Sequence, residues 1–491
     1  MKLAVLTATS TAVLIASVST ATLADQLEQS EHPSDNSLSL KLRNYYQDRQ
    51  LKDFKQSYYI ETLPDGTQRK VKNHDKQQAW GQGLEVNFES AYLGSPEAGI
   101  GFDFSLYGGL KLLGDKDRYG TTILKQDTPE YDPAKREYLA DQSSYGKVGL
   151  ANIKGFAGDN HTNIHAHAGW ISIEKPLLKT YHRLTPTNFQ GAKADAKLGD
   201  FDLYGAWTNK VSLYNHDKME EFTSNKPGKD GRYKNRTKID YIYTVGGSYD
   251  HESGFGADLA YAESDSYLKL YHANLNYTFL LAEETSLFLE GQVYHGKENG
   301  DKWTSGNTTF GGFDKDANLY NLNAKLTYDM LSLSASYSQI KAEKNDSLGY
   351  FDYHLAYESG HDYDDLGYST KRQLSDFNYN GERVWQAGVQ YSFDQLGLPG
   401  LTMGYTYTQG SDIEATNMAR FRDKYKETEH NVALGYSFQQ KELKGLSVTL
   451  LYAQHKGDKE LSEIKNQDKD GYEYEGMTDL RLYVDYTVSV F

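Results

Sequence analysis

Three histidines with matching parity along the chain could share one face of a strand. They are His161, His165 and His167, and Asp159 has the same parity. Three imidazoles and a carboxylate on one face could hold a divalent metal ion. However, a glycine and an asparagine flank Asp159 as they would in a turn, and a turn would break the shared face. We therefore expect solvated histidines and no metal site.

Two acidic runs begin in the way that calcium-binding loops begin: residues 314–318 and residues 468–471. Neither run continues with both a central glycine and a glutamate at the full spacing, so we expect turns. The sequence has no G-x-S-x-G elbow, no P-loop and no H-E-x-x-H motif. No spacing of Ser, His and Asp indicates a nucleophile with its base. We predict neither an enzyme nor a cofactor.

Composition narrows the class of protein. The chain has 491 residues, with 52 Lys and Arg against 68 Asp and Glu, giving a net charge of −16. An acidic chain is a poor partner for nucleic acid, because phosphate binding needs clustered basic residues. Cysteine is absent, which excludes disulfides and thiolate metal sites. The mean hydropathy of −0.71 excludes a bundle of membrane helices. It does not exclude a transmembrane β-barrel, whose strands alternate apolar and polar residues.

The first residues are typical of an export signal. Lys2 precedes an apolar stretch from Leu3 to Val18, and small residues then lead to Thr22-Leu23-Ala24. This pattern predicts a signal peptide over residues 1–24, because the apolar stretch is too short to span a membrane and ends at a cleavage-like site. Residues 25–491 would then form the mature domain. Export leaves the periplasm, the outer membrane or the medium as its location.

The body of the chain alternates with a period of two. In Tyr271–Phe279 and in Tyr320–Tyr328, apolar residues occupy one face and Asn, His, Lys or Thr the other. Such alternation predicts β-strands with two unlike faces. Similar segments are Leu84–Tyr92, Phe102–Leu106, Phe255–Tyr261, Leu331–Tyr337, Val389–Phe393, Leu401–Tyr407, Val432–Phe438, Val448–Tyr452 and Leu480–Val490.

Three features favour a membrane barrel over a soluble β-sandwich or β-helix. Many apolar faces end in an aromatic residue, as in the interfacial belts of outer-membrane barrels. The other faces carry charged and amide side chains, which a water-filled lumen would solvate. The chain ends in an alternating strand with a terminal Phe491, although that residue is out of register with the apolar face. Short turns, including 395–400 and 439–445, alternate with long polar loops. The length allows roughly 16–18 strands.

Local motifs resemble the OprD family of outer-membrane channels. The clearest are Gln395–Thr402, which reads Gln-Leu-Gly-Leu-Pro-Gly-Leu-Thr, and Tyr407–Asp412, where Ser411 separates the glycine from the aspartate. Leu42–Arg49, Leu443–Ser447 and the stretch Val484–Tyr486 fit the same family. The middle of the chain is similar to the chitoporin branch, and the runs that carry this similarity are Phe189–Ala192, Trp207–Asn209 (which begins the next loop), Met219–Phe222 and Ser375–Glu382.

The resemblance implies an all-β fold: a transmembrane antiparallel barrel of about 18 strands. It also implies short periplasmic turns, long extracellular loops and a third loop folded into the pore. Such a channel lies in the outer-membrane lipid and is largely monomeric, with a trimer as the alternative. Its partner would be an oligosaccharide or another small polar solute.

The resemblance also suggests residues that line the channel. Carboxylate channels of this family carry a ladder of basic residues, and Arg43 and Arg49 match its start. Tyr45 has the same parity as both arginines, so all three share one strand face. Candidates in the inward loop are Lys179, Tyr181, His182 and Arg183, and those in the later chitoporin-like run are Asp376, Asn378, Asn380 and Glu382.

The ladder looks depleted further along the chain. Positions where such relatives carry arginine hold Thr406, Thr449 and Leu451. The inward candidates Glu85, Glu89, Asp103 and Asp258 are acidic, and Tyr107 and Tyr204 are aromatic. Aromatic rings stack on sugar rings, and polar side chains bind hydroxyl and amide groups. The sequence therefore favours passive uptake of chitooligosaccharides. The alternative is an OprD-type porin for carboxylates, amino acids or other small solutes.

Overall fold

A computed structural model describes residues 35–53, 58–62, 67–72, 74–116, 118–227, 236–357, 366–465 and 475–491. The predicted signal peptide, residues 1–24, and the acidic run 468–471 lie outside these ranges. Among the described residues, no helix is long and apolar enough to cross a membrane.

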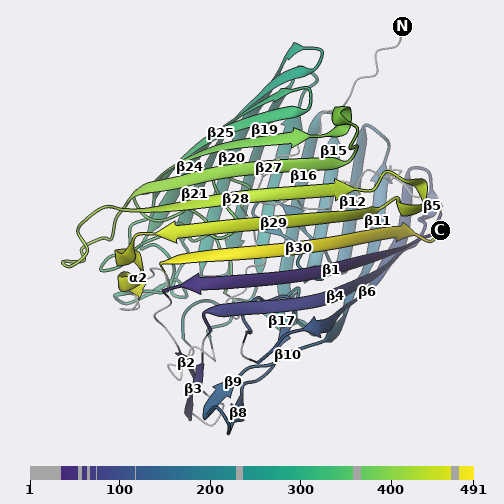
Figure 1. The fold of residues 1–491 in the computed structure, drawn as a ribbon. Coiled ribbons are helices and arrows are strands. Elements are labelled where there is room, and N and C mark those ends of the chain that lie inside the picture. The colour runs from purple at the N-terminus through teal and green to yellow at the C-terminus, as the bar shows by residue number, and fades with distance from the viewer. Residues whose placement is uncertain are drawn as a thin grey trace.

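Eighteen long strands, counted within the described residues, form the wall (Figure 1). In chain order they are β1 (Ser37–Lys52), β4 (Lys76–Glu89), β6 (Ala98–Leu113), β11 (Tyr145–Gly158), β12 (Thr162–Ile171), β15 (Asn188–Leu198), β16 (Phe201–Ser212), β18 (Ile242–Asp250), β19 (Phe255–Ser264), β20 (Leu268–Ala282), β21 (Thr285–Glu298), β24 (Asp316–Tyr328), β25 (Leu331–Lys341), β26 (Arg383–Ser392), β27 (Leu401–Ile413), β28 (Tyr425–Ser437), β29 (Leu446–Gly457) and β30 (Gly476–Ser489). This confirms the predicted all-β barrel and its strand number.

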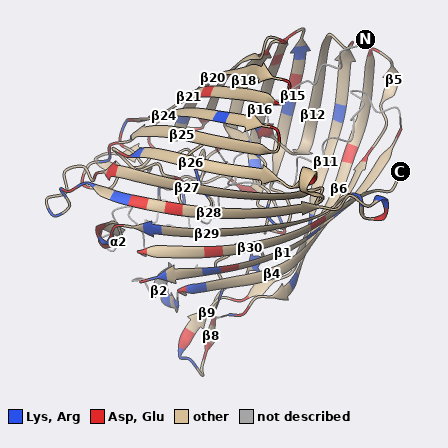
Figure 2. Cartoon of the chain, turned by 45° about the horizontal axis from the view of Figure 1, so that its top comes forward, with Lys and Arg blue, Asp and Glu red and all other residues tan. Residues whose placement is uncertain are grey.

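Short elements lie in the connections. They are β2 (Tyr58–Thr62), β3 (Gln68–Lys72), β5 (Leu93–Ser95), β7 (Lys125–Gln126), β8 (Glu130–Asp132), β9 (Glu137–Leu139), β10 (Gln142–Ser143), β13 (Glu174–Lys175), β14 (Leu178–Lys179), β17 (Glu220–Glu221), β22 (Thr304–Ser305), β23 (Thr308–Thr309), the 3-10 turns η2 (Asp394–Leu396) and η3 (Lys441–Leu443), and the helix α2 (Lys459–Lys465). The small sheet β2-β3-β9-β8 stands off the wall below β4 and β6 in Figures 1 and 2.

The barrel closes because its first strand pairs with its last. β1 pairs antiparallel with β4 on one side and with β30 on the other. The register of the closing pair sets Arg43 opposite Asp485, and Arg49 opposite Asp479. Within the described residues, closure leaves the wall itself without an unpaired edge strand, as a strand-built wall in lipid requires.

The two faces of the wall differ as the alternation predicts. Leucine, phenylalanine and tyrosine side chains point outward and are exposed, as Leu275 and Leu322 are. Aromatic pairs mark both ends of this apolar band: Tyr436 and Phe438 near the short turns, and Trp385 and Tyr407 near the long loops. This arrangement matches the aromatic belts of outer-membrane barrels.

The connections are short at one end of the barrel and long at the other. The predicted turns 395–400 and 439–445 are present; η2 overlaps the start of the first turn, and η3 lies within the second. One expectation about boundaries was wrong: residues 207–209 lie within β16, and the loop begins only after Ser212. Trp207 and Thr208 pair with both β15 and β18, and Asn209 lies at a register shift in the pairing with β15, which the motif alone did not reveal.

The interior is filled by chain that folds back from the long loops. Two pieces matter below: the first inner segment, residues 172–187, and the second inner segment, residues 366–382. Leu184 of the first packs in a buried cluster with Tyr45 and Ala79 of the wall. Tyr368 and Phe377 of the second belong to a larger buried cluster that includes wall residues from β15 to β26. The resemblance implied one inward loop; the structure adds the second.

Candidate functional site

Arg43, Tyr45 and Arg49 all lie on the interior face of β1, as their shared parity requires. Tyr46 points the other way, and its ring meets Trp80 edge-on at 6.5 Å between centroids. The Tyr45 ring stacks on Tyr483 at 4.3 Å and is only 1% exposed. The wall and Leu184 therefore cover the ring that we expected a sugar to contact.

Arg43 joins the wall to the first inner segment. Its Nε donates to Asp485 Oδ1 at 2.6 Å, and its Nη1 donates to the carbonyl oxygen of Arg183 at 2.9 Å. The side chain is buried, so each of these bonds is made in a poorly solvated place. The inner segment is thus held by a charged donor rather than by apolar contacts alone.

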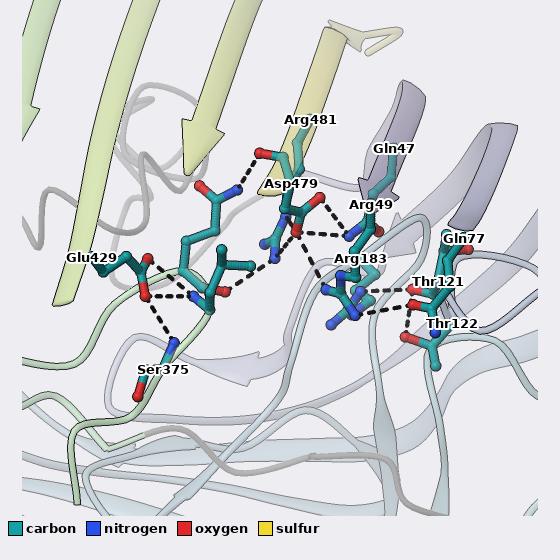
Figure 3. Close-up of polar contacts among 12 residues, drawn as sticks. Gln47, Arg49, Gln77, Thr121, Thr122, Arg183, Ser375, Glu429, Asp479 and Arg481 are labelled. Carbon is teal, nitrogen blue, oxygen red and sulfur yellow. Dashed lines mark hydrogen bonds and ion pairs between the residues drawn. The ribbon is translucent and has the colours of Figure 1, made fainter. Parts of the chain in front are cut away.

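Asp479 on β30 accepts hydrogen bonds from a second set of donors (Figure 3). Its carboxylate accepts from Arg481 at 2.8 Å, from Arg49 at 3.3 Å and from Gln47 at 2.9 Å. The Asp479 side chain is fully buried, and several charge-assisted bonds offset the desolvation of such a group. Arg49 also donates to Gln77 on β4 at 3.4 Å.

Arg183 completes a group of four arginines. Its Nη1 donates to the carbonyl oxygen of Thr121 at 3.0 Å, and its guanidinium lies over the rings of Tyr181 and Tyr214, 5.7 and 5.4 Å from their centroids. Cations are held by aromatic faces in this way. We call Arg43, Arg49, Arg183 and Arg481 the arginine group.

The other candidates of the first inner segment lie apart from this group. Lys179 is exposed at the end of the β13–β14 hairpin. Tyr181 packs beside Tyr214, 5.6 Å between centroids. His182 is exposed, and its Nε2 lies 3.7 Å from Glu174 Oε1. Of the four predicted residues, only Arg183 joins the arginine group.

The candidates of the second inner segment bond mainly within loops. Asn378 donates to the carbonyl oxygen of Phe351, and Asn380 accepts from the backbone of Ala342. Asp376 accepts from the hydroxyl of Tyr353 at 2.9 Å. Glu382 is fully buried at the start of β26. Contact of these four residues with a solute stays a prediction.

The sequence analysis missed Arg481 and Gln373. Gln373 Nε2 donates to the carbonyl oxygen of Asp479 at 3.2 Å, and Arg481 Nη2 donates to the carbonyl oxygen of Gln373 at 3.2 Å. Parity could have revealed Arg481, because it alternates with the outward Leu480 and Leu482. Nothing local marks Gln373, whose partners lie more than a hundred positions away.

Three of the four interior acids that we predicted lie beside basic groups. Asp103 Oδ1 lies 2.7 Å from Lys154 Nζ, and Asp258 Oδ1 lies 3.1 Å from His272 Nδ1. Glu85 lies 3.9 Å from Lys41 Nζ. The positions of the depleted ladder, including Thr406, do face the interior. In the arginine group, by comparison, three of the four guanidinium groups share the carboxylates of Asp479 and Asp485.

The interior surface formed by β24, β25 and β26 differs from the arginine group in the charge of its side chains. In Figure 2 most of the length of β25 and β26 carries no charged residue. Apart from Lys325 on β24, the interior side chains here are mostly amides and hydroxyls. They include Asn321, Asn323, Ser334, Ser336, Ser338 and Gln386. We call this surface the neutral wall.

The histidines do not gather around a metal position. Asp159 accepts backbone hydrogen bonds from His161 and Thr162, which makes the predicted turn. His167 faces the interior beside Asn152, with its Nδ1 3.2 Å from Asn152 Oδ1. Within the described residues, no three His, Asp or Glu side chains are arranged to hold a metal ion.

A closed antiparallel barrel with an apolar outside and a charged inside is the form of a channel in the bacterial outer membrane. The description "outer membrane porin, OprD family" matches residues 31–490, and the chain belongs to this family. It is a non-enzymatic outer-membrane channel for small solutes.

Individual relatives are distant but cover most of the chain. Porin D of Pseudomonas aeruginosa is 26% identical over 486 residues, 96% of this chain and 95% of that protein. The chitoporin of Escherichia coli is 24% identical over 404 residues, 79% of this chain and 80% of that protein. The crystal structure of Acinetobacter baumannii OccAB2 has a TM-score of 0.70 at 20% identity, covering 94% of this chain and 100% of that one.

Proposed function

We propose that this channel takes up chitooligosaccharides passively into the periplasm. The neutral wall carries the proposal, because a neutral sugar chain needs many exchangeable hydrogen bonds and no strong fixed charge. Amide and hydroxyl side chains donate and accept, so they can bind both the hydroxyl and the N-acetyl groups of such a chain.

The bonds within the neutral wall link three neighbouring strands. The hydroxyl of Ser336 lies 3.0 Å from Asn323 Oδ1 and 2.9 Å from Gln386 Oε1, and its one proton can be donated to either amide oxygen. Gln386 in turn donates to Ser334 at 3.2 Å. A solute that replaces one of these neutral bonds loses little, because water or a sugar hydroxyl can take its place. Release should therefore be as easy as binding, which transport requires.

The similarity to the Escherichia coli chitoporin supports this choice of solute. Motifs in the second inner segment favour the same branch. We further propose that the channel works as a monomer, because one chain closes its own barrel.

A second candidate solute is a small carboxylate or amino acid. The arginine group supports it: it places four guanidinium groups beside the carboxylates of Asp479 and Asp485. Arginine binds carboxylates through paired hydrogen bonds. The similarity to Porin D extends over more of the chain than the similarity to chitoporin does, and its identity is slightly higher, 26% against 24%.

Single-channel current across a planar bilayer separates the two candidates. Chitohexaose, maltohexaose and benzoate are added in turn to the same channel. We expect chitohexaose to interrupt the current for longer, and at lower concentration, than maltohexaose does. If benzoate alone perturbs the current, the carboxylate candidate replaces the sugar. Equal interruptions by both sugars would remove the chitooligosaccharide proposal.

A further inference from the structure

A buried group of titratable side chains lies where the second inner segment returns to the wall. Glu382 precedes β26, Glu427 lies on β28 and His455 on β29, and they are 0%, 1% and 2% exposed. Ser375, seven positions before Glu382, belongs to the same group. None of these four residues belongs to the arginine group or to the neutral wall.

Glu427 is the acceptor at the centre of this group. His455 Nε2 lies 2.7 Å from Glu427 Oε2, so the imidazole donates through that nitrogen. The hydroxyl of Ser375 donates to the same carboxylate at 2.9 Å. The carboxyl of Glu382 lies against Gly410 on β27, and Gly410 is opposite Glu427 in the pairing of β27 with β28, so the two carboxyl groups are neighbours. The second inner segment therefore meets β28 and β29 through one carboxylate.

The carboxyl of Glu382 accepts one backbone hydrogen bond. Its Oε2 accepts from the backbone N–H of Tyr379 at 3.0 Å. Its Oε1 is buried and receives no donor among the described residues. A Cβ on Gly410 would collide with Oε1, so a glycine on β27 provides the space for it. Two ionised carboxylates this close and this buried would repel strongly, and one proton between them removes the conflict.

We propose that Glu382 is a positioning residue for conduction. Its carboxyl carries a proton that it donates to Glu427, and this bond fastens the root of the second inner segment to the wall. The same segment reaches the arginine group: Gln373 bonds to Asp479 and Arg481. Removal of the proton would place a second charge in the group and loosen the segment.

The direction of the pH dependence follows from the surroundings of Glu382. Burial, with Glu427 as the neighbouring charge, raises the pKa of Glu382 well above its ordinary value of 4.5. An acid with a raised pKa stabilises the fastened state fully below the ordinary value. That stabilisation is lost as the pH rises through the raised pKa. The segment should therefore be fastened at acidic pH and looser at alkaline pH.

Other charged groups near this site come from three elements. Glu429 on β28 accepts the backbone N–H groups of Leu374 and Ser375 and faces the segment. His455 faces Glu427 from β29. Arg372, within the segment, donates to Thr408 on β27, and burial lowers its pKa to about 10, so it stays charged near neutral pH. On β27, the uncharged Gly410 lies against the carboxyl of Glu382.

Single-channel recordings from about pH 5 to about pH 9 test the proposal. In the unsubstituted channel we expect the rate of brief current fluctuations to rise roughly threefold or more across this range. Glu382→Gln keeps a neutral donor at the same place, so its rate should stay at the acidic level throughout. Glu414→Gln removes an exposed acid near Gly381 and should keep the full pH dependence.

A flat profile in the unsubstituted channel would overturn the proposal. An unchanged pH dependence in Glu382→Gln would overturn it too. If Glu382→Gln yields no folded barrel, Glu427→Gln decides. Its amide removes the neighbouring charge and can donate to ionised Glu382, so the transition should move down by about one pH unit or more. A transition at the original pH would then refute the role of Glu382.

Discussion

Arg43 and Arg183 are 140 positions apart in the chain, yet Arg43 Nη1 donates to the carbonyl oxygen of Arg183 at 2.9 Å. The same guanidinium holds Asp485 on the neighbouring strand. One side chain therefore connects the seam of the barrel, where β1 meets β30, with the loop segment that fills part of the interior. The shape of the channel depends on this connection.

Arg43→Met should change both stability and conductance. The substitution leaves the buried carboxylate of Asp485 without its charge partner, which should lower the free energy of unfolding by about 3 kcal/mol. It also frees the carbonyl of Arg183, so the open-channel current should become noisier. Urea unfolding in lipid vesicles and bilayer recordings measure the two effects. Adding Asp485→Asn should restore most of the stability but leave the noise. Recovery of both would show that the Arg183 contact is unimportant.

Tyr45→Ala and Tyr46→Ala should act differently although the residues are adjacent. Tyr45 packs against Tyr483 and Leu184, so its loss should loosen the first inner segment, alter the current and shorten blocking by chitohexaose. Tyr46 lies outside against Trp80, so its loss should lower thermal stability by a few degrees and leave the current unchanged. Thermal melting and bilayer current compare the pair. Equal effects on current would contradict the placement of the two rings.

Arg481→Gln should shift ion selectivity toward cations. The arginine lies in the interior, where one fixed charge acts on every passing ion. Arg383→Gln makes the same change at an exposed position, and salt screens that charge. The reversal potential in asymmetric KCl should therefore move for Arg481→Gln and stay for Arg383→Gln. A similar shift in both variants would mean that surface charge sets selectivity.

Asn323→Ala tests the neutral wall. It removes an acceptor of Ser336 and a side chain that a sugar could bind, so the residence time of chitohexaose should fall about fivefold, equivalent to about 1 kcal/mol. Asn318→Ala is the matched control, because Asn318 lies on the same strand with outward parity. Current interruptions report the residence time. If the control shortens them equally, the neutral wall is not part of the solute path.

The sequence alone determined the class of fold and the two faces of its strands. Alternation with a period of two follows from strand geometry, so it is visible without knowledge of any partner. It correctly predicted a barrel with an apolar outside and placed Arg43, Tyr45 and Arg49 on one face. It could also have placed Arg481, whose parity is opposite to that of Leu480.

Only the tertiary structure decided how the loops fill the barrel. A loop has no period, and its position depends on bonds to residues distant in the chain, as Arg183 bonds to Thr121 and Gln373 to Arg481. Tyr45 and Glu382, which the sequence had suggested as residues open to a solute, are both buried in the folded chain. Parity places a side chain inside the wall, but packing by distant segments decides whether water or a solute can reach it.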